Sequence, residues 1–140
     1  MSGCADSESN FYGYVTQKAA VFGPNGDVLV VRSAASHPWS IPGGRVQDDE
    51  AAAEALAREL REETGLTVGV GEPVQTATDL WQTAGGEPMF TVVYACETAD
   101  RGVELNHEHD EYEWVGVAEA TRRMPTESLT VAVQRATERR

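Results

Sequence analysis

A glycine loop followed by an acidic helix constrains this chain more than any other feature. Residues 43–66 begin with two glycines, continue through an alanine-rich run that strongly favours helix, and end near Gly65, where a glycine commonly closes a helix C-terminus. Asp48 or Asp49 is predicted to cap the start of the helix, because short acidic side chains accept hydrogen bonds from the first free backbone amides. The sequence therefore predicts one helix whose two ends are defined.

Three glutamates fall on one face of this helix. Glu59, Glu62 and Glu63 occupy positions i, i+3 and i+4, which places neighbouring Cβ atoms within about 6 Å of each other. Three carboxylates this close repel one another at neutral pH unless a divalent cation lies among them, and Mg²⁺ prefers such oxygen ligands. A solvated acidic face is the alternative interpretation, and helix geometry alone favours it.

The spacing of the whole segment resembles the complete Nudix box. Gly44 is followed after five residues by Glu50, and after seven more by the run from Arg58 to Leu66, Arg-Glu-Leu-Arg-Glu-Glu-Thr-Gly-Leu. Seven fixed identities would coincide by chance on the order of once in 10⁸ windows. The box spans 23 of the residues, so the rest of the chain has to be interpreted separately.

Length and composition favour one globular domain. The 140 residues are 41% hydrophobic, which is enough to bury a core without disulfides or structural metals. We expect residues 1–10, which are small and polar, to form a flexible tail and residues 11–140 to form the domain. No long apolar run and no secretory leader are recognisable, so a cytoplasmic protein that does not bind membranes is expected. Cys4 and Cys96 lie far apart, which argues against a disulfide.

The charge is strongly acidic, with 23 Asp and Glu residues against 11 Lys and Arg residues and a formal net charge of -12. This balance argues against binding of duplex nucleic acid or anionic membranes, since both require a basic surface. Only Lys18 is a lysine. We interpret the acidic, lysine-poor composition as halophilic, a surface suited to high salt, where self-repulsion is screened. An ordinary acidic protein is the alternative.

Apolar runs around the helix predict strands. Residues 14–22 and 28–31 are separated by turn formers and predict a hairpin, and a second hairpin is expected between 74–82 and 89–97. Further strands are predicted at 66–70 and 112–117, and a terminal helix at 127–139. Strands flanking one long helix, with another helix at the C-terminus, predict an α/β fold. The Nudix resemblance implies an α/β/α sandwich with a mixed sheet between helices.

The resemblance also implies a divalent-metal site and a hydrolase. It implies Mg²⁺, with Mn²⁺ as a substitute, bound by the Gly43 carbonyl and by Glu59, Glu62 and Glu63, while Arg58 orients a box glutamate and Glu50 has a similar supporting role. The general base is left open between a box glutamate and the downstream loop. In that loop His109 is suited to accept a proton near neutral pH and Glu108 to add an oxygen ligand.

Substrate recognition is weakly marked. Arg32 is a candidate for phosphate or ribose contact, although an arginine at a strand end is more commonly a surface residue. Trp39 and Trp81 are candidates for stacking on a base, with a core position as the alternative.

The leading hypothesis is cleavage of the pyrophosphate linkage in a nucleoside diphosphate joined to another group, such as an NTP, an NDP-sugar or ADP-ribose, by water attack at phosphorus. Two further readings stay open. The segments 39–47 and 108–114 resemble the GDP-mannose hydrolase branch of the family, in which water attacks the sugar carbon, and the fold also hosts non-catalytic nucleotide-binding modules. A homodimer is compatible with the family resemblance.

Overall fold

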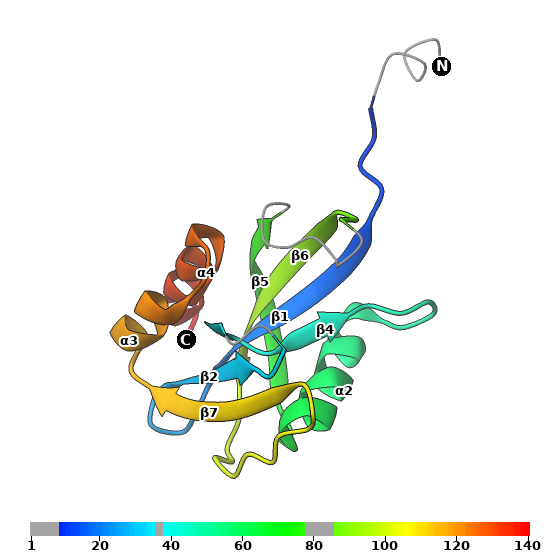
Figure 1. Cartoon of the computed structure of the whole chain (residues 1–140). Coiled ribbons are helices and arrows are strands. Elements are labelled where there is room, and N and C mark those ends of the chain that lie inside the picture. Colours follow the sequence, from blue (N-terminus) through cyan, green and yellow to red (C-terminus); the bar gives the residue numbers. More distant parts are fainter. Residues whose placement is uncertain (1–8, 36–37, 78–85) are drawn as a thin grey trace.

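The computed structural model describes residues 9–35, 38–77 and 86–140. A mixed sheet of seven strands has helix α2 on one face and helices α3 and α4 on the other (Figure 1). This arrangement confirms the predicted α/β/α sandwich. The elements are β1 (Tyr14–Phe22), β2 (Val28–Ser33), β3 (Trp39–Ser40), β4 (Gly43–Arg45), α2 (Ala52–Thr64), β5 (Gly69–Ala77), β6 (Met89–Glu97), β7 (His109–Val115), α3 (Val117–Arg123) and α4 (Glu127–Glu138).

Strand β1 lies at the centre of the sheet, and residues 19–22 in its second half are apolar on both faces. Ala19 and Val21 point into the cluster under α2, while Ala20 and Phe22 point into the cluster under α4. Strand β2 repeats this alternation, as expected when successive side chains of a strand face opposite ways. Along one edge β1 pairs in parallel with β6 over nine residues, starting at Tyr14 and Met89. The core therefore has two layers, one on each side of the sheet.

The first predicted hairpin forms only next to its turn. Gly26 has a φ of 80°, and the Gly23 amide donates to the Asp27 carbonyl at 2.9 Å, which closes the turn. Antiparallel pairing of β1 with β2 is recorded at Phe22 and Val28. Beyond that point β1 pairs with β4, whereas β2 pairs with β3 and β7. This split gives the Nudix box segment access to the middle of the sheet.

Helix α2 starts later than predicted. Its N-cap residue is Ala51, which makes no side-chain capping bond, so the expectation that Asp48 or Asp49 caps the helix is wrong. Asp49 has a φ of 65°, and the Glu50 amide closes a turn onto the Gln47 carbonyl, so these residues belong to the loop. The predicted end at Gly65 is confirmed, with a φ of 75° and a bond from its amide to the Arg61 carbonyl.

Three other elements differ from the sequence prediction. The strands predicted at 66–70 and 74–82 overlap a single strand, β5, which keeps its pairing with β6 through two register shifts around Pro73. Residues 78–82 of the second prediction lie outside the described residues. Strand β7 starts at His109, inside the segment predicted as a loop, because it pairs with β2 from Ser33 onward. Residues 117–123 form helix α3, which the prediction missed.

The second hairpin, formed by β5 and β6, is confirmed, and the terminal helix α4 is confirmed to within one residue. In the part of the chain described here, no helix has the length and apolar character needed to cross a membrane.

Candidate active site

The two glycines before α2 are required for different reasons. Gly43 pairs with Lys18 across β4 and β1, and a Cβ atom on Gly43 would overlap the Gln17 carbonyl oxygen. Gly44 lies against Glu59 instead, since a Cβ atom there would come within 2.5 Å of the Glu59 Cδ. Gly43 therefore allows β4 to lie close to β1, and Gly44 allows the Glu59 carboxylate to lie close to the backbone.

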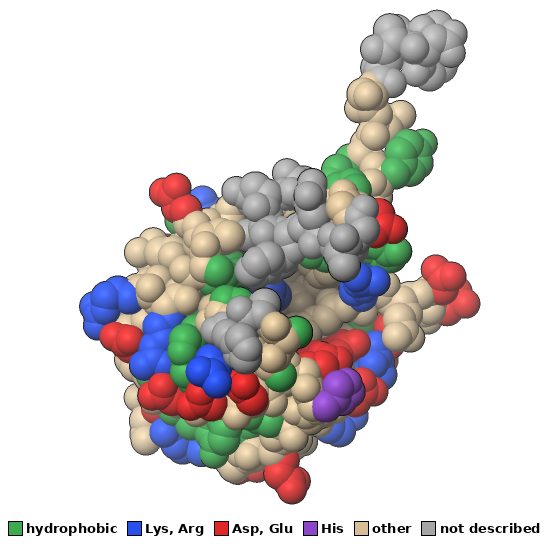
Figure 2. Space-filling model, in the orientation of Figure 1, with side chains coloured by type: hydrophobic (Ala, Val, Ile, Leu, Met, Phe, Trp, Pro, Cys, Tyr) green, Lys and Arg blue, Asp and Glu red, His purple; other side chains and the backbone are tan. Residues whose placement is uncertain are grey.

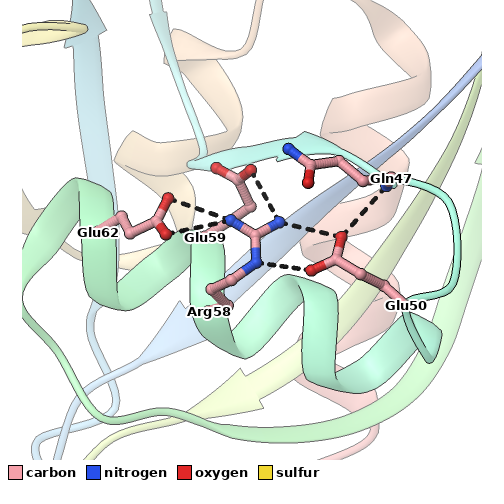
Figure 3. Close-up of polar contacts among 5 residues, drawn as sticks. All are labelled: Gln47, Glu50, Arg58, Glu59 and Glu62. Carbon is pink, nitrogen blue, oxygen red and sulfur yellow. Dashed lines mark hydrogen bonds and ion pairs between the residues drawn. The ribbon is translucent and has the colours of Figure 1, made fainter.

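Arg58, in the middle of α2, joins the carboxylates of Glu59 and Glu62 on the same helix to that of Glu50 in the loop before it (Figure 3). Its guanidinium makes a bidentate contact with Glu50 at 2.6 and 3.0 Å and donates to both Glu62 oxygens at 3.1 and 3.2 Å. A longer contact of 3.4 Å reaches Glu59. The hydrogen bonds from Arg58 lower the pKa of Glu50, and those carboxylates raise the pKa of Arg58. Arg58 thus fixes the loop and two box glutamates relative to one another, as the resemblance implied.

Glu63 is the most unusual side chain in this site. It is only 1% exposed, and no donor among the described residues bonds either of its oxygens while both carboxylates are ionised; a hydrogen bond between Glu63 and Glu59 forms only when one of them is protonated. Burial raises the pKa of Glu63 to about 9, and the nearby charges of Glu108 and Glu59 add to that rise. Burial also raises the pKa of Glu59. A buried carboxylate without partners is costly, so a ligand that binds it would remove the cost.

These carboxylates fit a divalent cation. In residues 9–35, 38–77 and 86–140 no three His, Cys, Asp or Glu side chains already stand in ligand positions. The available donors are nevertheless carboxylate oxygens, which Mg²⁺ prefers. The Glu63 oxygens accept no hydrogen bond from a donor among the described residues, and the charges of Glu59 and Glu108 are close enough to shift the pKa of Glu63. Glu62 is 57% exposed at the rim and pairs with Arg58. The structure thus groups Glu108, which is 45 positions away in the sequence, with the box.

A cavity lies beside the carboxylates, between β1, β2, β3 and β7. One part has a volume of about 230 Å³, and its lining includes Ser33, Ser40 and Ile41 together with Lys18 and His109. A wider part of about 540 Å³ is lined by Lys18, His109, Gly43 and Glu108, among others. Figure 2 shows a hollow in this face, with acidic and histidine side chains below it. Two of the proposed metal ligands, Gly43 and Glu108, therefore border the wider part.

His109 and Lys18 face this cavity from different strands. The His109 Nδ1 is buried and has no hydrogen-bond partner among the described residues, and burial followed by the Lys18 charge lowers the pKa of His109. A neutral imidazole is therefore present near pH 7. Burial lowers the pKa of Lys18 to about 8, and the Glu63 charge opposes this shift. The sequence interpretation did not place Lys18 in the site, although a single lysine inside an apolar strand was the available signal.

Two of the three residues predicted to contact the substrate already make other contacts. Arg32 makes a bidentate ion pair with Asp110 at 2.9 and 3.1 Å and a second ion pair with Glu111, so its charge is already balanced. Trp39 packs against the core cluster under α4, with the Arg123 guanidinium 4.8 Å from its ring centre. Trp81 lies outside the described residues.

Three similar proteins carry different names, two of which refer to the cleavage of phosphate linkages. The chain is 36% identical over 119 residues to an octanoyltransferase of Myxococcus xanthus, covering 82% of this chain and 33% of that protein. It is 32% identical over 96 residues to the asymmetrical bis(5'-nucleosyl)-tetraphosphatase of Mus musculus, covering 66% and 65% of the two chains. It is also 33% identical over 107 residues to a CTP pyrophosphohydrolase of Escherichia coli, covering 73% and 76%. The chain thus spans less than two thirds of the first two proteins.

Solved structures share the fold. The dihydroneopterin triphosphate pyrophosphohydrolase of E. coli superposes with a TM-score of 0.79 at 16% identity, over 94% of this chain and all of that one. A C. elegans Ap4A hydrolase complex superposes with a TM-score of 0.77 at 19% identity, over 89% and 96%. The family model for the NUDIX domain matches residues 15–135, which include the box, the sheet and most of α4. The chain therefore belongs to the Nudix family of hydrolases.

Proposed function

We propose that this chain is a divalent-metal-dependent hydrolase that cleaves the pyrophosphate linkage of a nucleoside diphosphate joined to another group, with water attacking phosphorus. The observation that carries the proposal is the buried Glu63 carboxylate, whose two oxygens lack partners while Glu59 and Glu108 lie near it. The similar E. coli and mouse proteins, whose names refer to a pyrophosphohydrolase and a tetraphosphatase, support the same bond type.

The residues would share the work as follows. Glu59, Glu62, Glu63 and Glu108, with the Gly43 carbonyl, would hold Mg²⁺ or Mn²⁺. When bound, such an ion neutralises phosphoryl oxygens and lowers the pKa of a coordinated water. Arg58 holds Glu50 and Glu62 in place, so the carboxylates need little reorganisation when the substrate binds.

His109 supplies a neutral imidazole beside the cavity. Its lowered pKa keeps it able to accept a proton near pH 7, which suits it to the role of general base. A box glutamate is the competing base. A His109→Ala variant that retains full activity would assign the base to a glutamate, whereas a loss of more than about a hundredfold in kcat would support His109.

A substrate panel tests the proposal. NTPs, dNTPs, ADP-ribose, dinucleoside polyphosphates and NDP-sugars are incubated with Mg²⁺ or Mn²⁺ at low and high KCl, and products are separated by chromatography. Reaction in ¹⁸O-labelled water locates the attack, since the label enters a phosphate for attack at phosphorus and the sugar for attack at carbon. Glu62→Gln and Glu63→Gln should each lower the rate by more than about tenfold. Absence of turnover across the panel in both salts would refute the hydrolase and favour a nucleotide-binding module.

A further inference from the structure

Lys18 places an ammonium group beside the acidic site, close enough for the Glu63 charge to act on it. It is the only lysine of the chain, and it lies in the central strand β1, opposite Gly43. Its ammonium group donates to the Ile41 carbonyl oxygen at 3.0 Å and to the Ser40 hydroxyl at 3.5 Å. Both partners are neutral, and no ion pair to Lys18 is found among the described residues. A half-buried ammonium group that makes no ion pair loses part of its hydration, so its position needs a reason.

The position of Lys18 provides that reason. Lys18 lines the narrow part of the cavity, which has apolar walls from Val31, Pro38 and Ile41. It also lines the wide part, together with Gly43 and Glu108, which are two of the proposed metal ligands. The ammonium group therefore stands between the acidic site and the narrow pocket, whose other lining residues, Ser33, Ser40 and His109, are polar. A nucleotide with its phosphates at the acidic site and its base in the narrow pocket would therefore pass the Lys18 ammonium group.

Other cations close to the site are already engaged. Arg58 is held by Glu50 and Glu62, and Arg32 by Asp110 and Glu111. Arg45, at the outer end of β4, stacks over the Tyr14 ring at 4.1 Å. Of these four cations, Lys18 is the one that lines both parts of the cavity.

We propose that Lys18 anchors the substrate by binding a non-bridging oxygen of the phosphate attached to the nucleoside. The inference rests on the function proposed above and extends it from the metal to the ligand. A phosphate oxygen fits better than a carbonyl oxygen of the base, because the phosphate carries a negative charge that attracts the ammonium group and the carbonyl is neutral. A charge-assisted contact of this kind is stronger than a neutral hydrogen bond.

A Lys18→Gln variant separates charge from hydrogen bonding, because glutamine keeps an N–H donor for Ile41 and Ser40 but removes the charge. Binding of AMP and adenosine, and of CMP and cytidine, is measured by calorimetry in one Mg²⁺ buffer. We expect binding of the monophosphates to weaken by about tenfold or more and binding of the nucleosides to change by less than about twofold. The matched control is Arg122→Gln, which removes the same charge from a side chain that is 67% exposed and pairs with Glu119.

A second measurement needs no variant. Reductive methylation modifies amines, so in the intact protein Lys18 and the N-terminal amine are the reactive groups, and mass spectrometry distinguishes them. AMP should slow modification of Lys18 by at least about fivefold relative to adenosine, given a charge-assisted contact, while the N-terminal amine reacts at an unchanged rate. This readout decides the question if Lys18→Gln does not fold.

The outcomes separate the two proposals. Equal weakening of monophosphate and nucleoside binding, unchanged binding, or no protection by AMP would overturn the assignment of Lys18. If these results occur while the substrate panel shows hydrolysis, the proposed function stands and only the anchor is wrong. If the panel is silent while Lys18→Gln selectively weakens AMP binding, the hydrolase is wrong and the anchor stands.

Discussion

The contact between Gly44 and Glu59 gives the sharpest prediction, because it separates activity from stability. In Gly44→Ala the new Cβ atom would lie 2.5 Å from the Glu59 Cδ and 2.6 Å from its Oε2. An ordinary contact starts at 3.4 Å, so the carboxylate has to retreat by about 0.9 Å. A displacement of about 1 Å in a site of this kind can lower the rate about 100-fold.

The same change should hardly affect folding. The atoms in the way belong to the end of a flexible side chain, and Gly44 does not have the positive φ found at Gly26, Gly65 and Gly86. Alanine also restricts the unfolded chain, so we expect the free energy of unfolding to change by no more than about 1 kcal/mol. Urea unfolding measures the stability, and kcat/KM with the half-saturating Mg²⁺ concentration measures the site.

Two other glycines serve as controls. Gly102→Ala meets only the Asp100 Oδ1 at 3.5 Å and should leave both properties unchanged. Gly43→Ala would overlap the backbone of β1, and we expect a loss of about 1–3 kcal/mol in stability. A Gly44→Ala protein with the wild-type kcat/KM would show that the pose of Glu59 is unimportant. A parallel loss of stability and activity would show instead that the backbone, and not the carboxylate, is strained.

Three further predictions concern Glu63, Glu50 and Thr126. Because the folded-state pKa of Glu63 is raised from its ordinary 4.5 to about 9, the native state retains a proton that the unfolded state loses. Metal-free wild-type protein in EDTA should therefore lose stability as pH rises from about 5 to 9, and Glu63→Gln should lose less over the same range. Melting temperatures that fall equally with pH in both proteins would contradict the burial argument. Glu50→Gln removes the bidentate partner of Arg58 and should lower kcat/KM by about tenfold, with wild-type kinetics as the contrary result. Thr126→Ala removes the side-chain acceptor for the Leu129 amide at the start of α4. It should lower the free energy of unfolding in urea by about 1 kcal/mol and leave kcat/KM unchanged. A clear fall in kcat/KM of the folded variant would count against a purely structural cap.

Short-range patterns were predictable from the sequence. The spacing from Gly44 to Leu66 identified the family, and Gly65 marked the end of α2, because helix termination depends on a few neighbouring residues. The apolar runs predicted β1, β6 and α4 closely. The start of α2 was missed because hydrogen bonds from Arg58 and the Gln47 amide hold Glu50 in the loop, a contact that capping rules do not contain.

Long-range pairing decided the remaining elements. β7 starts at His109 because β2 offers it a partner, and β5 is one strand because β6 continues beside it past Pro73. The strand propensity of a segment does not show which strand will lie next to it, and strand formation depends on the edge that is available for pairing.

By itself, the sequence determined that three carboxylates share one helix face, since i, i+3 and i+4 positions are adjacent in any helix. Only the tertiary structure decided that they differ: Glu62 lies at the rim, whereas Glu63 is buried without partners. It also brought Lys18 and His109, 91 positions apart, to one cavity beside them. The physical reason is that burial and charge balance depend on which strands pack over the helix, and those contacts join distant parts of the chain.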